Sequence, residues 1–339
     1  MPGPLLFVLY LAVGLAPLAL AWLQGLAPRP PADEVSSALA LMAFSLLLTE
    51  FVISGRFGWI SGRTGIDATM RFHQLVARPL TVLVLLHPFV YTLPVRPARP
   101  WETTQAASLG LDGASLLTGI AAWLLLALLV VAAICRDRIP YRYEAWRLSH
   151  GIAALLMAGA TTHHAVSAGR YSGDRVLGWF WLAMLALAAA TLLVVYVVRP
   201  LLQLRHPYRI AAVRSVGLKT WEVALEPARG EALGFRAGQF VWLTADRSPF
   251  SIREHPFSIA SAPAARGRVE FVIKEAGDFT NRIGELPVGG PAYLDGPYGN
   301  MVLPDGPAKG VCFLAGGVGI APILSMLREA AARGERRPM

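Results

Sequence analysis

Cysteine and charge are both scarce in this chain of 339 residues. Its two cysteines, Cys135 and Cys312, lie in different regions, which excludes a disulfide framework and a cysteine metal site. Charged residues make up 16% of the chain and hydrophobic residues 55%, which excludes an ordinary soluble protein. The net charge of +9 comes mainly from arginines beside apolar runs, so it indicates membrane orientation and no nucleic-acid partner.

The apolar residues are concentrated in the first 200 positions. Six runs are each near the 20 residues that cross a bilayer. They predict spans at residues 4–24, 36–54, 72–92, 114–135, 149–167 and 176–198. No basic residue precedes the first run, which therefore makes a poor signal peptide. The sequence predicts a lipid-embedded, multi-pass domain over residues 1–205, folded as a six-helix transmembrane bundle.

Arginines between the spans predict how the chain is oriented. One set lies in the even-numbered loops and after the sixth span: Arg56, Arg63, Arg71, Arg136, Arg138, Arg142, Arg147, Arg199 and Arg205. The opposite loops carry less net positive charge: Arg29 with Asp33 and Glu34, then Arg96, Arg99, Arg170 and Arg175. The positive-inside rule places the N-terminus and everything after residue 199 in the cytoplasm, beneath a bacterial-type inner or plasma membrane.

Four histidines in two of these spans carry the main functional signal. His73 and His87 are fourteen residues apart, and so are His150 and His164. Fourteen residues fall about 40° short of four helical turns and cover roughly 21 Å, so both members of a pair face nearly the same way. The third and fifth spans run in the same direction, which places His73 level with His150 and His87 level with His164. Imidazole is a standard axial ligand of haem iron, so two stacked haems are predicted.

Other interpretations of these histidines stay open. They could be buried polar residues satisfied by neighbouring helices, or a proton relay or metal site of a transporter. His163 is an alternative ligand to His164. On a straight helix His163 would point about 140° away from His150, and a π-bulge would change that; His164 is favoured.

After Pro200 the pattern changes to short β-type stretches. They cover residues 208–216, 220–227, 239–245, 257–261, 269–276 and 292–296. Alternating apolar positions divided by turn residues predict a small antiparallel β-barrel over residues 206–306.

Four short motifs lie in this second half. Three are compatible with ordinary turns or a helix cap: His255–Ser258, Gly277–Thr280 shortly after Lys274, and Asp295–Gly299. In the fourth, the apolar run 310–315 leads into a glycine turn and a helix, which is typical of a phosphate site. It predicts the first βα unit of an α/β nucleotide-binding domain over residues 307–339, although a turn that needs positive φ would look similar.

Taken in order, the paired histidines and the motifs HPFS, GDFT, DGPYG and GGVGIAP resemble the ferric reductase and NADPH oxidase superfamily. The second half resembles flavin domains of the ferredoxin–NADP reductase type. The resemblance covers nearly the whole chain. It implies an NAD(P)H-dependent oxidoreductase that passes electrons from cytoplasmic NAD(P)H through FAD and two b-type haems to an external acceptor.

The resemblance also implies the role of each site residue, with no catalytic residue outside the cofactor sites. The haem ligands would be His73, His87, His150 and His164. FAD would be lined by His255, Pro256, Phe257 and Ser258, with Phe257 against the ring and Ser258 near N5, and its pyrophosphate would lie near Lys274, Gly277 and Thr280. The NAD(P)H pyrophosphate would lie on Gly316, Gly317, Gly319 and Pro322. The chain reaches about 30 residues into the expected nicotinamide domain, where one βαβ unit alone needs that many, so a truncated domain or a longer protein is expected.

The external acceptor is less clearly encoded. Ferric chelate and oxygen are both compatible with the motifs, and so is a membrane cytochrome that passes electrons to a partner protein. Arg96, Arg99, Arg170 and Arg175 could attract an anionic ferric chelate, or could be solvated charges. Ferric iron is the favoured acceptor, with superoxide formation as the alternative.

Overall fold

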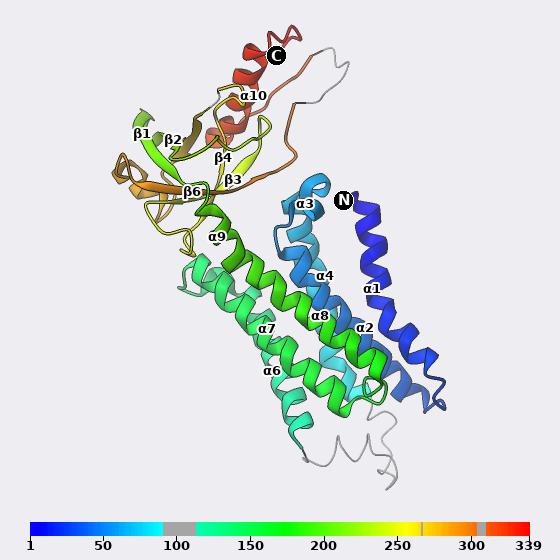
Figure 1. Cartoon of the computed structure of the whole chain (residues 1–339). Helices are drawn as coiled ribbons and strands as arrows, with labels where there is room; N and C mark the ends of the chain where they lie inside the picture. The colour runs from blue at the N-terminus through cyan, green and yellow to red at the C-terminus, as the bar shows by residue number, and fades with distance from the viewer. Residues whose placement is uncertain (91–112, 266, 304–309) are drawn as a thin grey trace. The chain divides into compact units, whose positions relative to one another are not determined.

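The computed structural model describes residues 1–90, 113–265, 267–303 and 310–339 (Figure 1). The chain separates into two compact units. The first comprises residues 1–60 and 67–193, and the second comprises residues 61–66 and 194–339. The last two residues of the predicted span 72–92, together with Arg96 and Arg99, lie outside the described residues.

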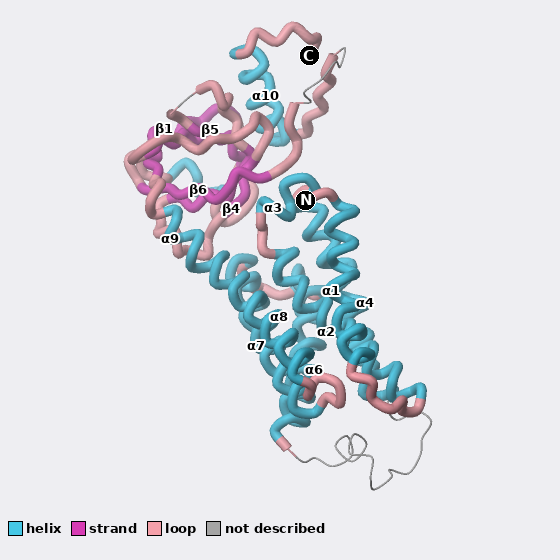
Figure 2. Tube along the Cα trace, turned by 45° about the vertical axis from the view of Figure 1, so that its right-hand side comes forward, coloured by secondary structure: helices cyan, strands magenta, loops and turns pink. Residues whose placement is uncertain are grey.

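The first unit is helical throughout its regular structure (Figure 2). Its helices are α1 (Gly3–Leu23), α2 (Pro31–Ser54), α4 (Ile66–Val90), α6 (Ala114–Ile134), α7 (Tyr143–Ala168) and α8 (Arg175–Leu193), and the short α3 (Gly58–Thr64) lies between α2 and α4 in sequence. Prolines at the first turn of α1 and α2 suit helix starts, where the missing N–H costs nothing.

Five helices in the described part of the chain are long and apolar enough to cross a membrane: α1, α2, α4, α6 and the continuous helix Arg175–Gln203 that begins with α8. Helix α7 has 26 residues but is not among the five, because its three histidines and other polar side chains lower its mean hydropathy. The unit is therefore an integral membrane domain, and the predicted span 149–167, which falls on α7, stays a prediction.

Helix α2 is the central element of this unit. In its apolar window 56% of the residues are buried, against 17% or less in the other four candidate spans. One face packs with α8 through Phe44, Leu48 and Trp181. A second face of α2 packs with α4, α6 and α7. Helix α1 also approaches α2 closely, because a Cβ added at Gly14 of α1 would lie 2.6 Å from Leu46 Cδ2 of α2. Small residues permit such close approach between membrane helices.

The second unit carries one six-stranded antiparallel sheet. Its strands are β1 (Tyr208–Gly217), β2 (Thr220–Pro227), β3 (Phe240–Ala245), β4 (His255–Ser258), β5 (Val269–Lys274) and β6 (Pro291–Tyr298), in the spatial order β4-β3-β6-β1-β2-β5. All five pairings are antiparallel. The six stretches expected from the sequence each overlap one of these strands, although β4 begins two residues before its predicted stretch.

The predicted closed barrel is only partly right. The two edge strands, β4 and β5, meet through the single bridge between Ile259 and Phe271 and not through a ladder. Strand β4 has four residues, so its outer edge offers few backbone groups for a ladder with β5. The sheet therefore curls around its core, which includes Val223, Leu243 and Phe271, without closing.

The predicted βα unit also differs in one half. Helix α10 (Ile320–Ala332) forms and follows the short turn η4 (Gly317–Gly319), but residues 310–315 adopt no strand. A strand is stabilised by hydrogen bonds to a neighbouring strand, and the only backbone hydrogen bond described for this segment joins Val311 N–H to Pro338 O.

Candidate electron-transfer site

The first histidine pair joins α4 to α7. The two helices share one hydrophobic cluster, which includes Leu80 of α4 and Met157 of α7. His73 Nδ1 is 2.9 Å from Glu50 Oε2. The His150 ring stacks on Trp146, with ring centroids 5.2 Å apart, and its buried Nδ1 has no hydrogen-bond partner among the described residues.

The second pair lies further along the same two helices. His87 is near the end of α4 and His164 near the end of α7. His87 Nδ1 is 2.6 Å from the carbonyl oxygen of Val84, and His164 Nδ1 is 2.8 Å from that of Ser115 in α6. A carbonyl oxygen only accepts, so both rings must carry their hydrogen on Nδ1, which leaves the Nε2 lone pair free.

These residues fit haem. A metal-binding histidine normally donates its second ring N–H to a carbonyl or carboxylate, which fixes the tautomer and the ring orientation. His87 and His164 face carbonyls, and His73 faces a carboxylate. Within the described residues no group of three or more His, Cys, Asp or Glu side chains could hold a bare metal ion. Haem iron needs only two axial side chains, because the porphyrin nitrogens complete its coordination.

The neighbouring His163 has a different environment. Its side chain is exposed and its Nδ1 lies 3.0 Å from Thr118 Oγ1. His164, by contrast, is half-buried and lies against Gly119 of α6, where an added Cβ would be 2.5 Å from His164 Nδ1. The geometry therefore favours His164 as the partner of His87. The contribution of Gly119 was not visible from the sequence, because nothing in its local pattern marks a close approach.

In the second unit the HPFS motif is strand β4 itself. Its pairing with β3 sets His255 opposite Leu243 and Ser258 opposite Phe240. The His255 ring stacks on Phe279, with centroids 4.2 Å apart and ring planes within 14°. The Phe257 ring lies 6.1 Å from Phe279. The sheet thus brings the HPFS and GDFT motifs together, through a phenylalanine that the sequence did not single out.

The loop that carries the GDFT motif is organised by Thr280. Its Oγ1 accepts hydrogen bonds from the backbone N–H groups of Ala276 (2.9 Å) and Gly277 (3.0 Å). The hydroxyl therefore stabilises the loop that leads into the short helix η3 (Thr280–Glu285) and makes no side-chain cap for η3 itself. Lys274 is exposed at the end of β5.

The DGPYG motif ends β6 and is tied to the linker helix α9 (Arg199–Gln203). Asp295 Oδ1 accepts a hydrogen bond of 2.7 Å from the Tyr298 hydroxyl. Asp295 Oδ2 lies 3.3 Å from the Arg199 guanidinium. Just before α9, the helix widens into a π-helical turn, η2 (Val194–Val198), a feature that often marks functional sites.

The glycine turn before α10 is open. Gly316, Gly317 and Gly319 are exposed, and a Cβ at any of the three would meet nothing within 4 Å. Gly317 has φ +54°, so a left-handed conformation is required there as well. Pro322 is buried in the first turn of α10. An open backbone at a helix start is compatible with an approaching phosphate.

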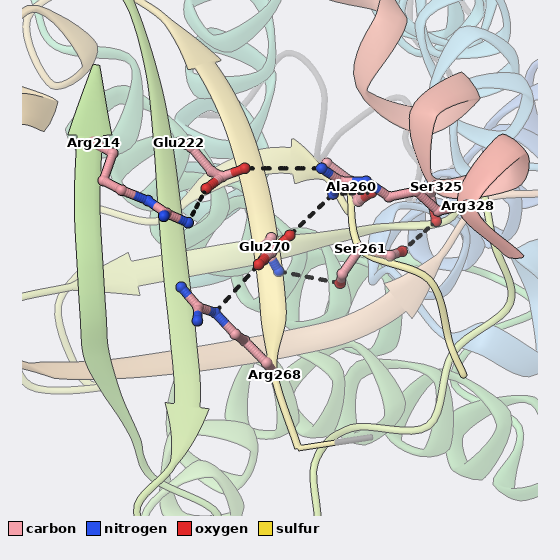
Figure 3. Close-up of polar contacts among 8 residues, drawn as sticks. All are labelled: Arg214, Glu222, Ala260, Ser261, Arg268, Glu270, Ser325 and Arg328. Atoms are coloured by element: carbon pink, nitrogen blue, oxygen red, sulfur yellow. Dashed lines mark hydrogen bonds and ion pairs between the residues drawn. The ribbon is translucent and has the colours of Figure 1, made fainter. Parts of the chain in front are cut away.

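Helix α10 is fastened to the sheet by polar contacts (Figure 3). Arg328 donates to Glu270 Oε2 (2.9 Å) and to the carbonyl oxygen of Ala260 (3.0 Å). One turn earlier, buried Ser325 donates to the carbonyl oxygen of Ser261 at 2.6 Å. Glu270 also pairs with Arg268 at 3.2 Å, so its charge is shared between two guanidinium groups. These contacts set the start of α10 relative to the flavin motifs.

Two protein families match the chain. Residues 39–161 match the family "Ferric reductase like transmembrane component", a stretch that includes His73, His87 and His150 and ends just before His164. Residues 212–303 match the family "Oxidoreductase FAD-binding domain", which includes the HPFS, GDFT and DGPYG motifs. The glycine turn before α10 lies outside both matches.

Known proteins resemble either part of the chain or most of it. The reductase component of propane 2-monooxygenase from Gordonia sp. (strain TY-5) is 33% identical over 134 residues, 39% of this chain and 38% of that protein. Dual oxidase 2 of Rattus norvegicus is 26% identical over 292 residues, 78% of this chain and 18% of that protein. The crystal structure of the Amycolatopsis cytochrome P450 reductase GcoB has 28% identity and a TM-score of 0.34, covering 39% of this chain and 40% of that chain. The chain thus spans less than two fifths of the length of the reductase component.

Proposed function

We propose that this chain belongs to the ferric reductase and NADPH oxidase superfamily and is an NAD(P)H-dependent oxidoreductase that carries electrons across a membrane, as the two family matches and the similarity to dual oxidase support. The electrons would pass from NAD(P)H through FAD and two b-type haems to an acceptor on the opposite side, with ferric iron favoured. The observation that carries the proposal is that α4, with His73 and His87, and α7, with His150 and His164, pack into one hydrophobic cluster, with Nδ1 of His73 on a carboxylate and Nδ1 of His87 and His164 on carbonyl oxygens.

The membrane part of the proposal rests on six spans. Helix α7 is the sixth, because it packs against α6 and α8, which belong to two of the five apolar candidates. With the N-terminus and residues after 199 in the cytoplasm, the first pair (His73 and His150) lies toward the cytoplasm and the second pair (His87 and His164) toward the opposite face. The pairs are roughly 21 Å apart along the helices, which spans most of the bilayer core.

The second unit would hold the flavin and the nucleotide. FAD, when bound, supplies the conversion of a hydride into single electrons, which the haem irons then carry. Around it, Phe257 would pack on the ring, His255, Pro256 and Ser258 would line it, and the strand pairing of β4 would keep them in place. Lys274, Gly277 and Thr280 would lie near its pyrophosphate. The open turn of Gly316, Gly317 and Gly319, with Pro322 behind it, would receive the pyrophosphate of NAD(P)H.

The acceptor remains the least constrained part. Arg170 donates to the carbonyl oxygen of Ala27 and lies 5.8 Å above the Tyr171 ring, so it already has protein partners. Burial and the hydrogen bond to the Glu34 carboxylate raise the pKa of the Tyr171 hydroxyl, which stays neutral. The similarity to dual oxidase over 78% of the chain favours oxygen as a second candidate acceptor. Ferric-chelate reduction measured beside superoxide formation decides between the two.

The first experiment is an absorption spectrum of the detergent-purified protein before and after dithionite. The expected result is a sharp b-type α band on reduction, two haems per chain by pyridine haemochrome, and releasable FAD. Absence of any haem band would overturn the proposal and would favour the alternative interpretation, in which the histidines form a proton relay or a metal site.

Replacing Gly119 with valine should remove one haem and leave the other. The valine side chain would enter the space of the His164 ring and break its 2.8 Å contact to Ser115 O. Gly159→Val in α7 is the matched control, because a Cβ at Gly159 meets nothing within 4 Å while the cost of a β-branched residue in a helix is the same. Equal haem content in the two variants would contradict the position assigned to the second site.

A further inference from the structure

A buried glutamate lies beside the first histidine pair. Glu50 of α2 is 3% exposed in one of the apolar candidate spans. Its Oε1 accepts a hydrogen bond of 2.6 Å from the Tyr10 hydroxyl of α1, and its Oε2 is 2.9 Å from His73 Nδ1. The Tyr10 ring packs edge-on against Phe72, with centroids 5.0 Å apart. Ionisable side chains inside membranes are costly and usually functional.

The four paired histidines differ in what holds Nδ1. His73 faces a carboxylate, whereas His87 and His164 face the neutral carbonyl oxygens of Val84 and Ser115. The fourth, His150, has no Nδ1 partner in the described part of the chain. A carboxylate is therefore associated with the first pair, and the second pair is held by backbone carbonyls.

We propose that Glu50, held by Tyr10, is a positioning residue that acts through His73 and makes the first haem site harder to reduce than the second. This inference rests on the proposed haem ligation. With Nε2 of His73 on the iron, Nδ1 carries the hydrogen and donates to Glu50, so both carboxylate oxygens accept hydrogen bonds. A carboxylate on Nδ1–H raises the basicity of the ligand more than a neutral carbonyl does, and this favours the ferric state.

This difference in potential would give electron transfer between the two haem sites a preferred direction. A first site of lower potential and a second site of higher potential make the step between them downhill toward the side opposite the flavin. The protein would obtain this bias without different iron ligands, because all four are histidines. The difference lies only in the groups that face Nδ1 of each histidine.

The same helix offers a matched control. Glu34, at the other end of α2, also accepts a short hydrogen bond from a tyrosine, Tyr171, and it pairs with Arg29. None of the histidines is among its described partners. Glu34→Gln therefore removes a carboxylate of the same kind from the same helix without touching a ligand.

The test is a redox titration of the purified full chain with optical detection, together with haem stoichiometry and electron paramagnetic resonance of the oxidised haems. Glu50→Gln should shift the midpoint potential of one haem upward and change its g values, leaving the other haem unchanged. The shifted haem should be the one that His73→Ala removes. Tyr10→Phe should shift the same haem by less than Glu50→Gln does, because it keeps the carboxylate and removes only the donor that holds it, and Glu34→Gln should shift neither haem.

The outcomes separate the inference from the proposed function. Two haems with unchanged potentials in Glu50→Gln would overturn the inference and leave the proposed function intact. If the wild-type protein binds no haem, the proposed function fails and the inference falls with it. If Glu50→Gln loses the first haem, Tyr10→Phe decides, because it keeps the carboxylate; an unchanged potential there would overturn the inference. A role in folding alone would lower haem content or thermal stability without moving a potential.

Discussion

Replacing His87 with alanine is expected to leave the flavin and one haem in place and to abolish reduction of any acceptor on the far side of the membrane. Alanine offers no lone pair, so the second site keeps only His164, while the first pair is roughly 21 Å away along the helix and retains its own contacts. The distance from the first haem site to an acceptor on the opposite face of the membrane is then too long for electrons to cross without the second site.

The measurement uses the full chain in proteoliposomes with the flavin reduced chemically on the flavin side. Flavin reduction and haem content are read by absorption, and acceptor reduction is read with a membrane-impermeant ferric chelate and with a superoxide probe. The expected result is one haem per chain, normal flavin reduction, and loss of both acceptor signals.

His163→Ala is the control for this variant. His163 is exposed, and its Nδ1 contacts Thr118, so its loss should preserve both haems and acceptor reduction. Survival of external reduction in His87→Ala would show that electrons do not pass through the second site. Loss of a haem in His163→Ala, with both retained in His164→Ala, would exchange the roles of these neighbours.

Gly238→Ala is expected to give the largest loss of stability in the second unit. Gly238 precedes β3 with φ +97°, and an added Cβ would lie 2.0 Å from the Met301 carbonyl oxygen and 2.3 Å from Met326 Cε. Left-handed strain costs about 1–3 kcal/mol, and overpacking adds about 1–3 kcal/mol. Since Met326 is a buried residue of α10, the helix that carries the glycine turn should be displaced from the sheet.

Thermal unfolding of the flavin domain in the full chain, followed by the rise in flavin fluorescence, measures this effect. Gly230→Ala is the matched variant, because Gly230 has φ +71° but a Cβ there meets nothing within 4 Å. It isolates backbone strain from the clash. Similar melting temperatures for the two variants would show that the contacts with Met301 and Met326 relax without cost.

The resemblance to the two matched families could be read from the sequence because its signals are local. Apolar runs of about 20 residues predict membrane helices, because lipid offers no hydrogen-bond partners and a helix makes all of its backbone hydrogen bonds internally. The fourteen-residue spacing of the histidines predicts one face of a helix, because the helix period is a local property. The alternation of the β stretches located all six strands for the same reason.

Three features needed the tertiary structure. Glu50 stands in a hydrophobic stretch with no local sign of a partner, and only the packing of α1, α2 and α4 brings it to Tyr10 and His73. The stacking of His255 on Phe279 depends on how β4 and the loop after β5 fold over the same core.

The third feature is the shape of the sheet and of the segment before α10. Closure depends on how many backbone groups the outer edges of the two edge strands can pair, and the four-residue β4 meets β5 through a single bridge, Ile259 to Phe271. Residues 310–315 have the composition of a strand but form none. The sequence by itself therefore determined the local elements and the motif order, because periodicity and residue type act within a few turns. The groups behind each histidine and the pairing of strand edges were decided by contacts between residues far apart in the chain, which no local pattern encodes.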